Sequence, residues 1–311
     1  MSGTKYANAV AAVRAMESSL LTHNDIDQLI ASRSLSEYSS ALASKDRAND
    51  TLEAVWEMLR GYAPEDKELE ILLYRSDFHN LKAALKAVIS GREPEHYFIK
   101  PTNLDLSALT EAIRSKDYER LPEYMQKTAA EAYELLTRTL DGQLSDSLID
   151  TAALNAMQEA AQKHGGSFMQ QYAELTTMYA DMKTAYRCAL MKKPRSFIET
   201  AICGSPELDK DDLVRAALEG TDGLFAYLEN TQYGDIAKLL RDDPAQFEKQ
   251  CDDAIIELAE TARMQAFGVE PLAAYYIAKE AEIKDLRIIS VCKESGTDNE
   301  TITERMRRLY V

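Results

Sequence analysis

The stretch SDFHNLKAALKAVISG, residues 76–91, returns near the end of the chain as AEIKDLRIISVCKESG, residues 281–296. The two align without a gap, so that an acid, a polar residue three positions on, a cation and a closing glycine coincide. The matched positions are Asp77 with Glu282, Asn80 with Asp285, Lys82 with Arg287 and Gly91 with Gly296. Such self-similarity at a long interval is typical of repeated structural modules.

A weaker copy lies between these two and is the second of three along the chain: ADMKTAYRCALMKK, residues 180–193, with Asp181 at the acid position and Thr184 three positions later. The three acids then lie at 77, 181 and 282, which are 104 and 101 residues apart. The spacing predicts three helical modules of about 100 residues, each ending in a comparable helix. We place them at residues 1–96, 97–196 and 197–311.

Few breaks punctuate the chain, since 311 residues contain only 12 glycines and 8 prolines. No segment shows a sustained alternation of polar and strand-forming residues, so we predict an all-α fold. Helix signals support this. We expect Ser205 and Pro206 to open a helix over 205–214, and Gly165 and Gly166 to end one after His164.

A long helix is expected from Pro271 to Gly296, because its apolar residues follow helical spacing. Directly after it, Thr297 and Glu300 have the spacing of a capping box, in which a side chain at each end bonds the other's backbone. We therefore expect a last short helix that continues to Val311.

Acidic residues dominate the charge: the formal net charge is −16 and the isoelectric point about 4.8. Such a chain repels nucleic acid and anionic lipid surfaces. Residues 205–260 hold 15 acids and 5 cations, which is 10 of the 16 net negative charges. This region is either a solvated face or a docking face for a basic partner.

The four cysteines, Cys188, Cys203, Cys251 and Cys292, have no metal-binding spacing, and their pattern fits a reducing cytosol. The N-terminal stretch contains Arg14 and Glu17, so we expect neither a signal peptide nor a membrane span there. The most apolar run, residues 271–278, is far shorter than the ~20 residues of a spanning helix. Any membrane association should therefore occur through a protein partner.

The repeated motif admits two interpretations. On a helix, the acid and the polar residue three positions on share a face, whereas the cation lies about 140° away. These residues either fix joints between adjacent helices or form an interface with a partner. The candidate residues are Asp77, Asn80, Lys82, Asp181, Thr184, Glu282, Asp285 and Arg287.

A catalytic interpretation is weak. His79 stands two positions after Asp77, and such positions on a helix point in different directions. No phosphate-binding loop, dinucleotide-binding glycine pattern or metal-binding histidine pair occurs. We expect no catalytic residue, no metal, no cofactor and no small-molecule ligand.

Two segments carry a family resemblance: YRSDFHNLKAALKA at 74–87 and EPLAAYYIAKEAEIKDLRIISVCKESGTDNETITERMRRLYV from 270 to the end. The chain resembles the C subunit of the V-type (A-type) ATPases and ATP synthases, the counterpart of the d subunit of the eukaryotic V-ATPase. The resemblance covers essentially the whole chain, and the C-terminal block is its most specific part.

This resemblance implies a three-fold pseudosymmetric helical funnel with a central socket. It implies a non-catalytic rotor component on the cytoplasmic face of the membrane, seated on the proteolipid ring and receiving the D and F subunits of the central shaft. It does not say which helix contacts the ring and which the shaft. The alternatives are a soluble helical-repeat scaffold unrelated to ion transport and, less in keeping with the residues, a helical enzyme.

Overall fold

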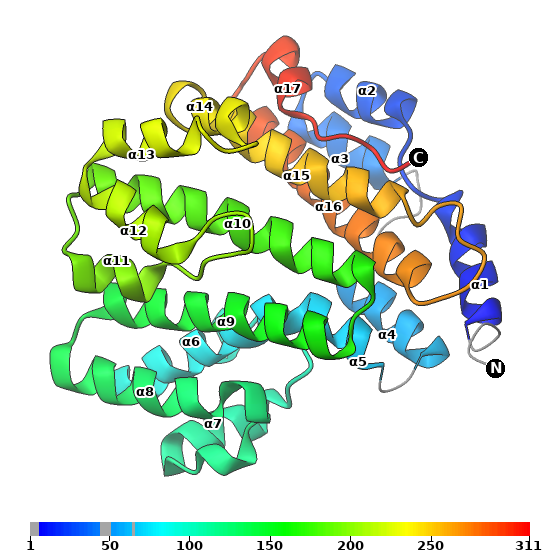
Figure 1. The fold of residues 1–311 in the computed structure, drawn as a ribbon. Coiled ribbons are helices and arrows are strands. Elements are labelled where there is room, and N and C mark those ends of the chain that lie inside the picture. The colour runs from blue at the N-terminus through cyan, green and yellow to red at the C-terminus, as the bar shows by residue number, and fades with distance from the viewer. Residues whose placement is uncertain (1–5, 44–50, 64–65) are drawn as a thin grey trace. The chain divides into compact units, whose positions relative to one another are not determined.

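A computed structural model describes residues 6–43, 51–63 and 66–311 (Figure 1). The first five residues of the N-terminal stretch therefore lie outside the described part. The chain divides into two compact units: residues 1–69 together with 241–311, and residues 70–240. The predicted modules at 1–96, 97–196 and 197–311 divide the chain differently, by repeated sequence, and remain a prediction.

The first unit brings both ends of the sequence together, as the blue and red segments of Figure 1 show. Its longest helix, α16 (Glu270–Glu294), packs against α1, α3, α4, α15 and α17. The apolar contacts include an edge-on stacking of Trp56 against Tyr276, with ring centroids 5.5 Å apart. The other helices are α1 Ala7–Glu17, α2 His23–Ala31, α3 Leu35–Ala43, α4 Leu52–Tyr62, α15 Pro244–Glu260 and α17 Asn299–Arg305, and α5 Lys67–Glu70 and α14 Gly234–Asp242 cross the unit's limits.

The second unit is organised around α9 (Gly142–His164), which packs against α6, α8, α10 and α11. Figure 1 shows α9 between α8 and α10. The remaining helices are α6 Tyr74–Ser90, α7 Leu106–Ser115, α8 Glu123–Thr139, α10 Ser167–Leu190, α11 Arg195–Ala201, α12 Lys210–Leu218 and α13 Thr221–Leu228, with short 3-10 turns η1 Ile71–Leu73, η2 Glu95–Tyr97 and η3 Tyr118–Arg120.

The all-α prediction is confirmed, because the described residues contain helices and turns but no strand. None of these helices combines the length and the apolar character that a membrane crossing requires.

Two stretches of the chain have the same local architecture, one in each unit. Helix α10 is closed at Lys192, which has a left-handed backbone, and α16 is closed in the same way at Gly296. Each end carries the same two backbone hydrogen bonds, which satisfy carbonyls that the helix leaves open. Three residues on, α11 and α17 begin; each has seven residues and leads into an extended segment. All these landmarks differ by 104 residues.

The first copy is a shortened version of this arrangement. Helix α6 closes on Gly91, again left-handed and with the same pair of backbone bonds. The three-residue turn η2 takes the place of α11 and α17, and the backbone becomes extended at Phe98. The three left-handed residues lie 101 and 104 positions apart.

Several helix ends differ from the sequence-based expectation. Helix α12 begins at Lys210, capped by the Asp209 side chain, whereas Ser205 caps only a turn that ends at Leu208. The Asp209 carboxylate accepts the backbone N–H groups of Asp211 and Asp212, so the helix begins five residues later than the Ser205 signal indicated. Likewise Asp298, not Thr297, caps α17, which is followed from Met306 by an extended segment.

The glycine pair after α9 does end that helix at His164, as predicted. The cause differs from the one inferred. Gly165 has an ordinary negative φ of −89°, and a Cβ at this position would lie 2.8 Å from the Ala161 carbonyl oxygen. Close packing, not a left-handed turn, explains this glycine.

The two equivalent short helices should contribute equally to stability. Ile198 of α11 and Ile302 of α17 hold the same position in their helices and are fully buried. We expect Ile198→Ala and Ile302→Ala each to lower the free energy of unfolding by about 2–5 kcal/mol, the cost of a cavity in a packed core. Urea unfolding of the full chain measures this. Val291→Ala, at a position 54% exposed, is the control, and an equally small loss in all three variants would contradict the prediction.

Candidate functional site

In the first copy, two polar side chains of α6 hold the segment that follows η2. The Asn80 amide accepts the backbone N–H of Ile99 at 2.8 Å and donates to the carbonyl of the same residue at 3.0 Å. Asp77 accepts from the Asn103 backbone at 2.8 Å and from the Tyr124 hydroxyl at 2.8 Å. Both side chains are fully buried. They act as joints within the chain.

In the second copy, Asp181 of α10 does the same for the segment after α11. Its two carboxylate oxygens accept the backbone N–H groups of Cys203 at 3.0 Å and Gly204 at 2.7 Å. Burial raises the pKa of Asp181 to about 6, although these two bonds and the Lys210 charge oppose the rise.

In the third copy, Asp285 of α16 accepts the backbone N–H of Arg307 at 3.2 Å. Its other oxygen, Oδ2, has no hydrogen-bond partner among the described residues. Burial raises the pKa of Asp285 to about 6. One turn earlier, Glu282 accepts from the Leu21 backbone and from the Lys279 ammonium at 2.6 Å. This is a buried ion pair, since Lys279 and Glu282 are 1% and 4% exposed.

These bonds correct the register of the middle copy. Asn80, Asp181 and Asp285 each stand 11 positions before the left-handed residue that closes their helix. Asp181 therefore corresponds to Asn80 and Asp285. The alignment based on the acids alone had matched it with Asp77 and Glu282, which is a shift of three positions. The sequence match rested on residue type, and an amide replaces the acid in the first copy.

The corrected register adds Lys183 to the cations Lys82 and Arg287, which the sequence comparison had already matched. Two positions after each joint residue stand Lys82, Lys183 and Arg287. Lys82 forms an ion pair with Asp150 at 2.6 Å. Lys183 is half-buried and Arg287 is exposed. Thr184, which the sequence comparison matched with Asn80, is half-buried. In the corrected register it is no longer the equivalent of Asn80.

The eight predicted residues thus fall into two groups. The five that are buried bond other parts of their own unit: Asp77, Asn80, Asp181, Glu282 and Asp285. The three others, Lys82, Thr184 and Arg287, retain exposed surface. Their role in an interface remains a prediction.

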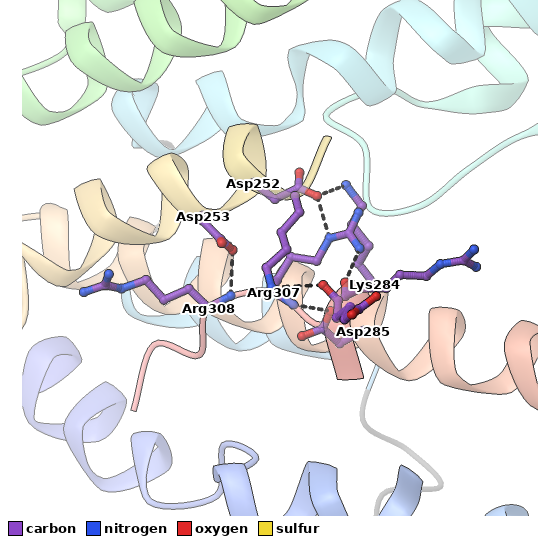
Figure 2. Close-up of polar contacts among 9 residues, drawn as sticks. Asp252, Asp253, Lys284, Asp285, Arg307 and Arg308 are labelled. Carbon is purple, nitrogen blue, oxygen red and sulfur yellow. Dashed lines mark hydrogen bonds and ion pairs between the residues drawn. The ribbon is translucent and has the colours of Figure 1, made fainter. Parts of the chain in front are cut away.

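The C-terminal tail, residues 306–311, is fastened along α15 (Figure 2). Asp252 binds both the Lys284 ammonium at 2.5 Å and the Arg307 Nε at 2.9 Å. Asp253 accepts the backbone N–H of Arg308 at 2.6 Å. The residues labelled in Figure 2 therefore join α15, α16 and the tail within the first unit.

Arg308 extends this contact along α15. Its guanidinium forms a two-pronged pair with Glu260, at 2.8 and 2.9 Å, and a further bond of 2.9 Å to Glu257. These carboxylates hold the pKa of Arg308 above its ordinary value. The last part of the acidic region 205–260 thus binds the chain's own basic tail, an outcome that the sequence interpretation did not include.

His79 and Asp77, the pair weighed for acid–base chemistry, have separate partners. His79 contacts the Tyr97 carbonyl, whereas Asp77 is occupied by the donors named above. Within the described ranges, no group of histidine, cysteine and acidic residues is arranged to hold a metal ion. The geometry is that of a set of structural joints with charged surface beside them.

Comparison with known proteins gives the family. The family model for the ATP synthase (C/AC39) subunit matches residues 9–305. The chain belongs to this family. The C subunit of the V-type sodium ATPase of Enterococcus hirae is 27% identical over 82% of this chain and 79% of its own length. The C subunits of the A-type ATP synthases of a Desulfurococcus species and of Thermococcus kodakarensis are each 23% identical, over 97% of this chain and 90% of their own lengths.

The two buried acids should make this family member less stable as pH rises. Because the folded chain holds the Asp181 and Asp285 protons more tightly than the unfolded chain does, their stabilising contribution is complete below about pH 4 and is lost as pH rises through about 6. Asp181→Asn removes the Asp181 share of this loss and leaves that of Asp285, so the variant should gain on the wild type by up to about 3 kcal/mol between pH 4 and pH 7.

Urea unfolding at a series of pH values measures this difference. Glu294→Gln removes an exposed carboxylate and is the matched control. Parallel pH curves for Asp181→Asn and the wild type would contradict the prediction.

A substitution at Asp252 tests how much the contact between α15 and the C-terminal tail stabilises the chain. Asp252→Asn removes the carboxylate that binds Arg307, whose side chain is only 9% exposed. We expect a loss of about 1–3 kcal/mol in unfolding free energy, because a charged donor stays buried without its partner. Asp235→Asn breaks an exposed pair with Lys238 and should cost under about 0.5 kcal/mol. Equal losses in the two variants would show that the tail contact adds nothing.

Proposed function

We propose that the chain is the central-rotor component of a V-type or A-type rotary ATPase and has no catalytic residues of its own. In this role it sits on the cytoplasmic face of the membrane proteolipid ring and receives the D and F subunits of the shaft. The observation that carries the proposal is the family match over residues 9–305, since the curated relatives are named as the C subunits of such ATPases and ATP synthases.

A rotor joint must bear the work of ion transport. One charge that crosses 100 mV releases ~2.3 kcal/mol, so a stroke of several ions delivers on the order of 10 kcal/mol. This approaches the ~12 kcal/mol that holds a nanomolar complex together. A broad joint with several contact points is therefore expected. Three modules around an axis, at 1–96, 97–196 and 197–311, would provide such contacts and enclose a socket for the shaft.

The repeated helix ends support three modules. Each long helix closes on a left-handed residue and then binds the extended segment beyond it through a buried side chain, at Asn80, Asp181 or Asp285. Such joints would hold each extended segment against its helix under load. Among the cations two positions on, Arg287 is exposed and is the one to test as a partner contact. Whether the transported ion is a proton or sodium is determined in the ring.

Copurification tests the role directly. The tagged chain, expressed with its native ATPase in cells, should retrieve a proteolipid and the shaft subunits from detergent-solubilised membranes. The purified chain alone should not hydrolyse ATP. Retrieval of soluble proteins without a proteolipid would favour the alternative, a helical scaffold unrelated to ion transport, and ATP hydrolysis by the pure chain would indicate an enzyme.

Charge reversal tests the repeated cation. Arg287→Glu should reduce retrieval of the ring or shaft several-fold and leave the chain folded, because Arg287 is exposed. The control is Arg138→Glu, at an exposed position on α8 outside the repeat. Reversal at Glu282, by contrast, is unsuitable, since that side chain is buried against Lys279. Equal retrieval by Arg287→Glu and the control would remove Arg287 from the interface.

A further inference from the structure

An open groove of about 350 Å³ lies within the second unit. Its floor is one face of α6, and its far side is the segment that follows this helix. The residues that line it include His79, Lys82, Ala83, Lys86, Ala87, Arg92 and Tyr97. The groove is not one of the repeated joints, and its interpretation does not depend on the rotor role.

Most charges around the groove are already paired. Lys82 and Lys86 bind Asp150 and Asp146, each at 2.6 Å. Glu93, the acid beside Arg92, binds Arg114 at 2.8 Å. The Arg92 guanidinium is different: it is exposed and makes no ion pair or side-chain hydrogen bond within the described residues. The groove therefore has one uncompensated positive charge, at the end nearest the close of α6.

The groove follows α6 along much of its length. Its lining positions on α6 run from His79 to Ser90. At 1.5 Å per residue this face is about 16 Å long, which is the length of about five residues of extended peptide. Two small side chains, Ala83 and Ala87, form the floor, and the ring of Tyr97 is 52% exposed at the rim. This shape fits small apolar side chains.

We propose that the groove binds an extended segment of a partner protein that presents one carboxylate between small apolar side chains. The carboxylate pairs with Arg92, whose planar fork can donate two parallel hydrogen bonds. The apolar side chains lie on Ala83 and Ala87. A nucleotide or another polyphosphate fits less well, because Asp146 and Asp150 already neutralise both lysines and would repel several added negative charges.

The binding of defined peptides tests this proposal. The probe is a fluorescein-labelled, amidated peptide of sequence Ala-Val-Glu-Val-Ala, and its partner probe replaces the glutamate by glutamine. Fluorescence anisotropy with the full chain at low salt should show that the glutamate peptide binds at least about tenfold more tightly, as expected when a charged pair worth about 1.4 kcal/mol is lost. Excess unlabelled ATP should not displace it.

Variants locate the site. Arg92→Glu, at an exposed position, should weaken binding of the glutamate peptide by at least about tenfold and leave the fold intact, as judged by circular dichroism. The control, Arg138→Glu, removes an exposed arginine of the same unit that pairs with Glu134 and should bind like the wild type. Equal affinity for the two peptides, undiminished binding by Arg92→Glu, or displacement by ATP would each overturn the proposal, the last in favour of a small-anion site.

Discussion

A buried side chain that binds the backbone of a later segment is the interaction on which this chain depends. Burying a carboxylate or an amide is costly unless donors and acceptors meet it. At Asn80, Asp181 and Asp285 the partners come from segments 19 to 23 residues downstream. Each bond ties the segment beyond a long helix to the middle of that helix, which local helix formation alone could not achieve.

The position of these joints has a mechanical consequence. The left-handed helix ends at Gly91, Lys192 and Gly296 reverse the chain, and the joints then fix where the reversed chain lies. At the C-terminus this is reinforced by Asp252 and Asp253, which hold Arg307 and Arg308. The rotor role proposed above would require segments that are fixed in this way.

Helical spacing and the closing glycines of the first and third copies are local signals, and for this reason the fold class and the repeated helix ends could be predicted from the sequence. The middle copy was misplaced, since Lys192 closes that helix with a left-handed backbone that residue type does not reveal. The tail contact was also missed. Pairs such as Arg308 with Glu260, 48 residues apart, are created by packing and leave no periodic trace. Of the eight candidate residues, the five buried ones bond other parts of their own unit, and an interface role for the other three remains a prediction.

Amide hydrogen exchange measures the joints most directly. If Asp181 and Asp285 hold the extended segments, Asp181→Ala should speed exchange at Cys203 and Gly204, and Asp285→Ala should speed it at Arg307, each by about tenfold or more. This follows because a lost buried hydrogen bond costs about 1–3 kcal/mol. Each variant should leave the other segment protected. Unchanged exchange at these amides, or equal acceleration across the whole chain, would contradict the account.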